Sequence, residues 1–215
     1  MDYEEWEPYY LEIVRDFGFD PEKDELAGQV LLSLISLRDT LSAEELRALV
    51  RGKAVRVYGP AAPNLHGFDG LKFATDSAVK AMLSASLVPD VIFTDLDGDV
   101  GDMLKSSELG SIVVLHAHGD NVDALRKYVG SIKGRLAATV QTRPYPPLIN
   151  FGGFTDGDRA VFASVSLGAV HTEITGFDFE KPVEKPGMTE EQRKIKKRKL
   201  EWARRLISML EVKVV

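Results

Sequence analysis

The stretch Val91-Ile92-Phe93-Thr94-Asp95-Leu96-Asp97-Gly98-Asp99 joins a short apolar run to three carboxylates. The run 91–94 is typical of a buried strand, so Asp95, Asp97 and Asp99 crowd together where that strand ends. Each carboxylate disfavours the ionisation of its neighbours, and a divalent cation among the oxygens removes this repulsion. Mg²⁺ prefers a few carboxylates together with substrate phosphates. The stretch therefore predicts a Mg²⁺ site at a strand end, with chemistry on phosphate groups.

A calcium loop and a solvated turn are the alternative interpretations of these aspartates. A calcium loop would need Gly directly after Asp99 and Glu at its last position, where the chain has Val100 and Ser106. The calcium loop is therefore excluded. The solvated turn stays open, because Asp-Gly pairs are common in turns.

Short apolar runs alternate with helical patterns on both sides of this stretch. Strands are predicted at 54–58, 72–75, 91–94, 112–115, 136–140 and 170–174, and helices at 77–87, 122–129, 156–167 and 189–210. Strands that alternate with helices predict right-handed crossovers between parallel strands. The expected fold class is therefore α/β, with a doubly wound, mostly parallel sheet of the Rossmann-like type.

The first part of the chain has a different pattern. Apolar residues recur at helical spacing between Leu26 and Leu37, and Ser42-Ala43-Glu44-Glu45 is a capping box. We expect residues 1–52 to form an N-terminal helical extension. Residues 53–215 are expected to form the α/β catalytic domain, which includes a long C-terminal helix.

Composition sets further limits on the function. With 215 residues, of which 44% are hydrophobic, the chain can build one sizeable core. The net charge of −6 argues against a nucleic-acid partner, and the lack of cysteine excludes thiolate zinc sites and cysteine nucleophiles. The apolar stretch 30–37 is too short to cross a membrane, and the first 25 residues carry ten acidic residues, unlike a signal peptide. We expect a cytoplasmic protein without a membrane partner.

Polar clusters follow the predicted strands at their carboxyl ends, where open parallel sheets bind ligands. The clusters lie at 59–64, at Asp76, at 95–99, at 116–121 and at 141–142, and one crevice can collect them. The residues expected to hold a nucleotide there are Gly59, Asn64, His116, His118, Gly119, Asn121, Gln141 and Thr142. A purely structural role for the cluster 116–121, as a strand-end turn and helix cap, stays open.

The segment 150–159 is another polar cluster, and its glycines let the backbone approach a ligand closely. Arg159 can pair with a phosphate or with a carboxylate of the crevice. Phe151 and Phe154 either stack on a flat ring or enter the core. The substrate-binding residues expected in this segment are Asn150, Phe151, Gly153, Phe154 and Asp156.

The predicted C-terminal helix is strongly basic. Its cationic residues are Arg193, Lys194, Lys196, Lys197, Arg198, Lys199, Arg204 and Arg205. They form either a patch for phosphate or RNA, or a solvated helix face, and the negative net charge of the chain favours the solvated face. The apolar residues expected to face the core are Ile195, Leu200, Leu206, Met209 and Leu210.

Four pieces of the chain, taken in order, resemble a known family. They are Ala74-Thr75-Asp76-Ser77-Ala78, Thr94-Asp95-Leu96-Asp97-Gly98-Asp99, His116-Ala117-His118-Gly119-Asp120-Asn121 and Asn150-Phe151-Gly152-Gly153-Phe154-Thr155-Asp156-Gly157-Asp158-Arg159. The set resembles the archaeal 6-hydroxymethyl-7,8-dihydropterin pyrophosphokinase family, which is similar in fold to thiamin pyrophosphokinase. The family's usual Asp-Gly-Ala is Asp76-Ser77-Ala78 in this chain, so the aspartate is kept and the glycine is replaced.

The resemblance implies transfer of a pyrophosphoryl group from ATP to the hydroxymethyl oxygen of a reduced pterin. It also implies that AMP leaves, that Mg²⁺ is required, and that the product enters biosynthesis of a folate-like or methanopterin-like coenzyme. In this chemistry the protein mainly positions the reactants and neutralises charge. ATP and a reduced pterin are therefore the expected partners.

Roles for individual residues follow from this chemistry. Asp95 and Asp97 are expected to hold Mg²⁺, with Asp99 or Asp120 completing its ligands. The residues expected to act in catalysis are Asp76, Asp97, Asp120, Asp156 and Arg159. Among them, one carboxylate, Asp76 or Asp156, accepts the proton of the attacking hydroxyl.

Other functions fit part of the pattern. Thiamin pyrophosphokinase uses a different acceptor in the same type of reaction. A sugar-nucleotide transferase would use Asp95-x-Asp97 as a D-x-D metal site, and a non-catalytic nucleotide-binding or RNA-binding module would use the basic C-terminal helix. A homodimer is an assembly that the sequence leaves open.

Overall fold

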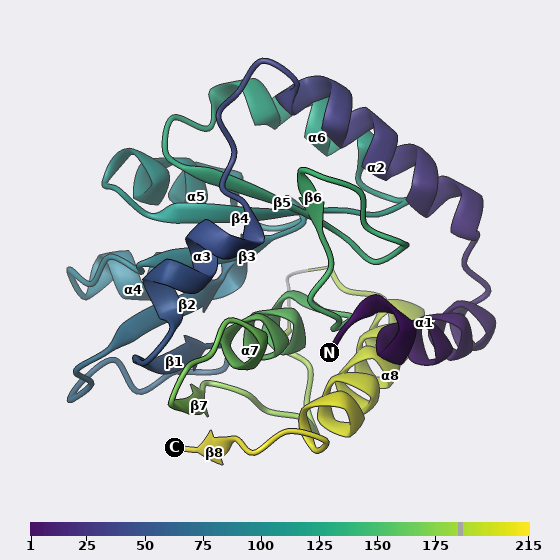
Figure 1. Cartoon of the computed structure of the whole chain (residues 1–215). Coiled ribbons are helices and arrows are strands. Elements are labelled where there is room, and N and C mark those ends of the chain that lie inside the picture. Colours follow the sequence, from purple (N-terminus) through teal and green to yellow (C-terminus); the bar gives the residue numbers. More distant parts are fainter. Residues whose placement is uncertain (185–186) are drawn as a thin grey trace.

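The apolar runs form one sheet in which every strand is parallel to its neighbours (Figure 1). The computed structural model describes residues 1–184 and 187–215, apart from the side chain of Asp76. Its strands are β1 (Ala54–Tyr58), β2 (Leu71–Thr75), β3 (Val91–Thr94), β4 (Ile112–Ala117), β5 (Leu136–Val140), β6 (Leu148–Ile149), β7 (His171–Thr175) and β8 (Lys213–Val214). In this described part of the chain the strand order is β6-β5-β4-β3-β2-β1-β7-β8.

Helices cover both faces of the sheet. They are α1 (Tyr3–Phe17), α2 (Pro21–Ile35), α3 (Ala43–Val50), α4 (Asp76–Ser84), α5 (Val100–Glu108), α6 (Val122–Tyr128), the 3₁₀ turn η1 (Val129–Ser131), α7 (Asp156–Ser166) and α8 (Glu190–Ile207). α2, α4, α5 and α6 pack on one face; α3 and α7 pack on the other, with α1 and α8 beside α7 (Figure 1). In the described ranges, none of these helices is both long and apolar enough to cross a bilayer. The predicted α/β, doubly wound, parallel fold is confirmed.

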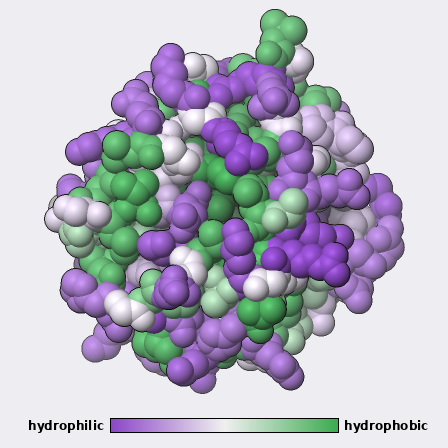
Figure 2. Space-filling view, turned by 60° about the vertical axis from the view of Figure 1, so that its left-hand side comes forward, coloured by the Kyte–Doolittle hydropathy of each residue, from purple (hydrophilic) through white to green (hydrophobic). Residues whose placement is uncertain are grey.

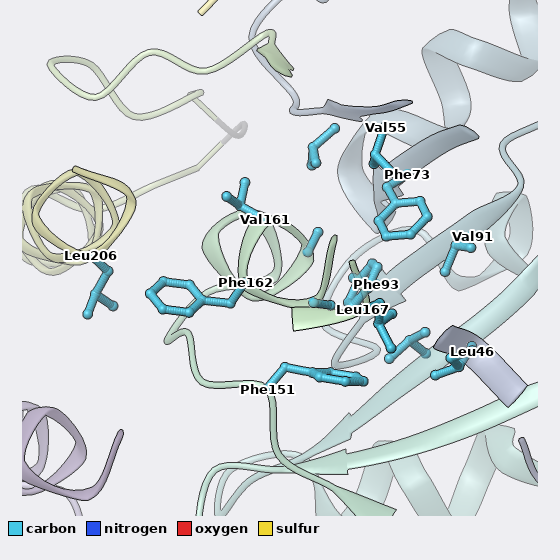
Figure 3. Close-up of a cluster of buried hydrophobic side chains, with 14 of the residues drawn as sticks. Leu46, Val55, Phe73, Val91, Phe93, Phe151, Val161, Phe162, Leu167 and Leu206 are labelled. Atoms are coloured by element: carbon cyan, nitrogen blue, oxygen red, sulfur yellow. The ribbon is translucent and has the colours of Figure 1, made fainter. Parts of the chain in front are cut away.

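The strands are apolar along their whole length because both faces of the sheet are buried. In β3, Val91 and Phe93 point into the core under α3 and α7, whereas Ile92 points into the core under α2, α4, α5 and α6. Figure 3 shows the first of these cores, where the side chains of α7 lie between the sheet and Leu206 of α8. This two-sided burial explains why short uninterrupted apolar runs predicted the strands correctly.

Residues 1–52 take part in both cores. Trp6 of α1 is 0% exposed, and its indole Nε1 donates to the backbone oxygen of Gln141 at 2.9 Å. α2 buries its apolar stripe in the opposite core. α3 begins at the predicted capping box, in which Ser42 and Glu45 bond to each other's backbone N–H. The division of the chain after residue 52 stays a prediction.

Some elements were not predicted from the sequence. α5 directly follows the three aspartates, and its N-cap is Asp99, whose Oδ1 accepts from the Gly101 N–H at 3.2 Å. β6 and β8 have two residues each, which is too short for a periodic pattern to be visible. The missed elements are therefore short or are set by local capping.

Two apolar residues at the C-terminus were wrongly expected to face the core. Leu206 is buried as expected, but Ile195 and Met209 are each 40% exposed. α8 ends at Ile207, so Met209 lies beyond the helix. Ile195 lies on a face of α8 that lines an open cavity, described below, and this accounts for its exposure.

Replacing Trp6 tests whether the N-terminal helices belong to the core. We expect Trp6→Ala to lower the free energy of unfolding by about 3–5 kcal/mol, because it removes a large buried side chain. Leu11→Ala on the same helix is the control; Leu11 is 49% exposed, and its loss should cost less than about 1 kcal/mol. Urea unfolding followed by circular dichroism measures both variants, and equal losses would contradict this packing.

Candidate functional site

A cavity of about 680 Å³ opens at the carboxyl ends of β1, β2, β3 and β7. The strand order reverses at β1, because β2 to β6 lie on one side of it and β7 lies on the other. Open parallel sheets bind ligands at such a point. Loops after these strands, the first turn of α7 and one face of α8 line the cavity.

The lining of this cavity combines both charges with aromatic rings. The acidic residues are Asp95, Asp97, Asp156 and Asp178, the basic residues are Lys181, Lys196 and Lys199, and the aromatic residues are Phe154, Phe177 and Phe179. The strand ends and α7 supply most of the acidic side, whereas α8 supplies two of the lysines. A ligand that carries negative groups and a flat ring matches this lining.

Local hydrogen bonds hold the turn that carries Asp95 and Asp97. The Thr94 Oγ1 accepts from the Leu96 N–H at 2.9 Å, and the Asp95 Oδ1 accepts from the Asp97 N–H at 3.1 Å. Leu96 has a φ of +66°, a left-handed conformation that is unusual for a residue other than glycine. Its side chain is buried in the core under α2, α4, α5 and α6, and this packing compensates for the strain.

Asp95 is held in its ionised form by its neighbours. Burial raises the pKa of this carboxyl, but the hydrogen bond and electrostatic interaction with His118 and the positive charge of Arg159 outweigh burial and leave the pKa well below its usual value. The Asp95 Oδ2 lies 3.2 Å from the His118 Nε2. A carboxylate that stays ionised at the cavity is suited to bind a cation.

The first turn of α7 brings Asp156 to the cavity and Arg159 next to it. The Arg159 Nη1 donates to the Asp156 Oδ1 at 3.0 Å, and its Nη2 donates to the backbone oxygen of Phe154 at 3.1 Å. Gly153 has a φ of +90°, and a Cβ at this position would lie 2.5 Å from the Arg159 Cα. The close approach of Arg159 therefore explains the glycine at position 153.

Asp158 caps α7. Its carboxylate accepts from the backbone N–H groups of Phe154 and Thr155 at 2.7 Å each, and from the Thr155 hydroxyl. Burial raises the pKa of Asp158, and the hydrogen bonds from Thr155 and Phe154 lower it only in part. This cap fixes the backbone from which Phe154 and Asp156 reach the cavity.

A buried carboxylate that sequence analysis missed, Asp24 of α2, holds the turn after β4. Asp24 accepts from the Gly119 N–H at 2.7 Å, from the Gln141 side chain at 2.7 Å and from the Tyr10 hydroxyl at 2.8 Å. In sequence Asp24 is one of several acidic residues around the polar first turn of α2, so nothing singles it out. Gly119 and Gln141, which we expected to contact a nucleotide, are thus engaged with the N-terminal helices.

Asn121 joins this turn to the acidic turn after β3. Its Nδ2 donates to the backbone oxygens of His116 at 2.7 Å and of Asp95 at 2.8 Å, and its Oδ1 accepts from the His118 N–H at 3.0 Å. Asn121 occupies the N-cap position of α6 as one interpretation predicted, but its side chain makes these bonds in place of a cap bond. The turn therefore positions Asp95 through both His118 and Asn121.

Other predicted nucleotide contacts lie inside the protein or in neighbouring loops. His116 is buried, its Nδ1 lies 3.0 Å from the Thr139 Oγ1, and burial lowers its pKa well below the usual value. A Cβ on Gly59 would lie 2.5 Å from the Gly176 backbone oxygen, so this glycine allows the loops after β1 and β7 to meet. The Asn64 N–H donates to the hydroxyl of the last residue of β7 at 2.9 Å.

The predicted substrate residues divide between the core and the cavity. Phe151 is 5% exposed and lies among the side chains of the core (Figure 3), whereas Phe154 belongs to the same core and also lines the cavity. The Asn150 side chain donates to the Thr142 backbone oxygen at 2.9 Å and accepts from the Gly152 N–H at 2.7 Å. Asn150 and Thr142 thus fix the chain between β5 and α7.

Asp95 and Asp97 are the carboxylates of the cavity that could bind a metal ion. Among the side chains that the structure describes, no three His, Cys, Asp or Glu residues are close enough to hold a metal by themselves. Asp99 caps α5 and borders a separate open groove with Asp97, and Asp120 is exposed in the turn after β4. Asp76 begins α4, but its side chain lies outside the described ones. Two cavity carboxylates fit Mg²⁺ when substrate phosphates supply further ligands.

The aromatic and basic residues from the C-terminal part of the chain were not predicted as site residues. The Phe177 ring packs closely against Gly157 of α7, because a Cβ at that position would lie 2.5 Å from the ring. Phe177 and Phe179 follow β7, so the rule that ligands bind at strand ends would have identified them. Lys196 and Lys199 carried no comparable signal, because the sequence does not show which face of α8 turns to the cavity. The structure places these two lysines at the cavity, and the choice between a phosphate patch and a solvated face stays open for the helix.

A smaller, mainly apolar cavity of about 310 Å³ lies between α3 and the amino ends of β2, β3 and β4. Figure 2, which brings the α3 to α5 side of the molecule forward, shows hydrophobic residues around a hollow in a largely hydrophilic surface. This cavity is at the end of the sheet away from the aspartates. It therefore is not the expected ligand-binding edge.

Comparison with known proteins assigns the chain to an enzyme class. A family model described as 6-hydroxymethylpterin diphosphokinase MptE-like matches residues 70–184, more than half of the chain. Three relatives are named 6-hydroxymethyl-7,8-dihydropterin pyrophosphokinase, an enzyme of the diphosphotransferase class.

The similarity to these relatives extends over nearly the full chain. The relative from Pyrococcus furiosus is 38% identical over 98% of this chain and 95% of its own length. Those from Methanothermobacter thermautotrophicus and Methanocaldococcus jannaschii are 36% and 34% identical, and cover 98% and 100% of this chain and 96% and 98% of their own lengths. The chain belongs to the MptE-like 6-hydroxymethylpterin diphosphokinase family, and the resemblance noted in its sequence is confirmed.

Replacing Asp24 tests its role in holding the turn after β4. We expect Asp24→Ala to lower the free energy of unfolding by about 2–4 kcal/mol, because it leaves buried donors of Gly119, Gln141 and Tyr10 without an acceptor. Glu25→Ala, at the exposed neighbouring position, is the control and should change stability by less than about 0.5 kcal/mol. Urea unfolding measures both variants. A loss from Asp24→Ala as small as that of the control would show that the network is not stabilising.

Proposed function

We propose that this chain transfers the pyrophosphoryl group of ATP to 6-hydroxymethyl-7,8-dihydropterin, forming the pterin diphosphate and AMP. The names of its relatives support this activity. The observation that carries it within this chain is that Asp95, Asp97 and Asp156 line one cavity at the point where the strand order reverses. The product would serve a folate-like or methanopterin-like coenzyme, and the reaction would take place in the cytoplasm.

In this reaction the hydroxymethyl oxygen attacks the β-phosphorus of ATP. The bond from the β-phosphorus to the oxygen that bridges to the α-phosphate breaks, and its electron pair leaves with AMP. The attacking hydroxyl also loses a proton. Asp156 is the proposed acceptor of this proton, because its carboxylate lines the cavity, and Asp76 is the alternative.

Asp95 and Asp97 are the proposed protein ligands of Mg²⁺. Asp95 is suited to this role because His118 and Arg159 keep its carboxyl ionised. Bound Mg²⁺ would supply positive charge at the phosphate oxygens of ATP. His118 and Asn121 are proposed to support this site by holding Asp95.

Arg159 and the aromatic residues complete the proposed site. The Arg159 guanidinium is fixed by Asp156 and by the backbone of Phe154, so its charge is already in place beside the carboxylates. Phe177 and Phe179 are partly exposed and line the cavity, where an aromatic ring can stack on a pterin or an adenine. The cavity volume of about 680 Å³ lies within the range of small-molecule sites, roughly 300–1,000 Å³.

Product analysis tests the proposed activity. The chain is incubated with Mg²⁺, the reduced hydroxymethylpterin and ATP labelled at its β-phosphorus, and the products are identified by mass spectrometry. We expect AMP and a pterin diphosphate that contains the label. Parallel reactions with thiamin as acceptor, and with a UDP-sugar as donor, should give no product. Formation of ADP in place of AMP, or a preference for thiamin, would refute the proposal.

A single substitution tests the acidic site. We expect Asp97→Asn to lower kcat/KM by at least about 100-fold, because it removes a charge that the bound metal needs. The matched control is Asp123→Asn on α6, where the side chain is 100% exposed and activity should be unchanged. Circular dichroism checks that both variants fold. Near-full activity of a folded Asp97→Asn variant would remove Asp97 from the proposed site.

A further inference from the structure

α8 presents a stripe of residues to the cavity. Gln192, Lys196, Lys199 and Ala203 line the cavity, and their spacing of three or four residues places them along one face of the helix. Lys196 and Lys199 are only partly exposed, whereas the nearby Lys194 and Lys197 are exposed. Lys196 and Lys199 therefore face the cavity, whereas Lys194 and Lys197 face solvent.

Another face of α8 is fastened to α1. The Arg198 guanidinium and the Trp202 indole both donate to the Asp16 carboxylate, at 2.7 Å and 2.8 Å. Arg205 makes two hydrogen bonds to the Glu12 carboxylate, at 2.6 Å and 2.9 Å. These contacts fix the rotation of α8 about its axis. The direction in which Lys196 and Lys199 project is therefore set by α1.

The Lys199 side chain is also held at the cavity itself. Its Nζ lies 5.6 Å from the centroid of the Phe154 ring, within the range of a cation–π contact. Phe154 lies two residues before Asp156, the first residue of α7. Lys199 and Asp156 line the same cavity from two elements, α8 and α7.

The carboxylates of the cavity need positive charges near them if a polyphosphate is to bind, and Lys196 and Lys199 can supply these charges. Asp95, Asp97 and Asp156 by themselves would repel the several negative charges of a polyphosphate. A metal ion offsets part of this repulsion, and ammonium groups that contact the phosphates offset more. A helix face that served solubility alone would not need lysines at the partly enclosed positions.

We propose that Lys196 and Lys199 bind the terminal phosphates of the triphosphate donor, the part that becomes the transferred pyrophosphoryl group. This inference rests on the proposed function, because it takes ATP as the donor. It makes α8 part of the donor site and makes α1 the element that positions α8. The nucleoside part of the donor does not depend on these lysines.

Nucleotide binding without any pterin tests the inference separately from the reaction. We compare the Lys196→Met/Lys199→Met double variant with wild type by isothermal titration calorimetry in the presence of Mg²⁺, using ATP and AMP as ligands. Methionine keeps an unbranched stem against Phe154. We expect the Kd for ATP to rise by about 10- to 100-fold and the Kd for AMP to rise by less than about threefold, because AMP lacks the terminal phosphates.

The control is Lys194→Met/Lys197→Met, which removes the same charge from the exposed side of the same helix. Its Kd for ATP should change by less than about threefold. Lys196→Arg/Lys199→Arg keeps the charge and should retain most of the affinity. Far-ultraviolet circular dichroism confirms that every variant is folded before it is titrated.

Three results would overturn the inference. They are an unchanged ATP affinity in Lys196→Met/Lys199→Met, an equal loss in the control double variant, and an equal loss of ATP and AMP affinity. Wild-type chain that binds ATP but forms no pterin diphosphate would instead refute the proposed function, and the comparison of variants would still decide the role of the lysines.

Discussion

The structure depends on one constraint: every strand of the described sheet is parallel, so all of them end at the same edge. The reversal of strand order at β1 opens a cavity at that edge. Asp95 and Asp97 reach it because they directly follow β3, and Asp156 reaches it because α7 begins there. Residues far apart in the chain are brought together by this topology, and local motifs then set their orientation.

The two sides of the cavity depend on different supports. The acidic side is held by short-range bonds within the turn of Leu96 and by the neighbouring turn of Asn121. The α8 side is held by ion pairs and an indole hydrogen bond to α1, whose Trp6 is itself anchored in the core. The N-terminal helices therefore help to position the elements that line the cavity, although these helices are far from Asp95 and Asp97 in sequence.

The sheet and the acidic cluster could be predicted from the sequence, because both depend on local patterns. Runs such as 91–94 are apolar since both faces of the sheet are buried, and a carboxylate pair at a strand end has few structural uses. Contacts between remote elements were not predictable. In sequence Asp24 resembles any surface acid, and only the packing of α2 against β4 and β5 gives it buried partners. Phe151 lies in the core alone, whereas Phe154 lies in the core and also lines the cavity. Lys199 differs from Lys197 only because the rotation of α8 turns Lys199 to the cavity.

The most direct test of this account is a crystal structure of the chain with Mn²⁺ and a non-hydrolysable ATP analogue, in which anomalous scattering locates the metal. The account predicts that the metal lies between Asp95 and Asp97, and that the triphosphate lies between this pair and the Lys196 and Lys199 ammonium groups. A metal bound next to Asp99, with the phosphates outside the cavity, would contradict it.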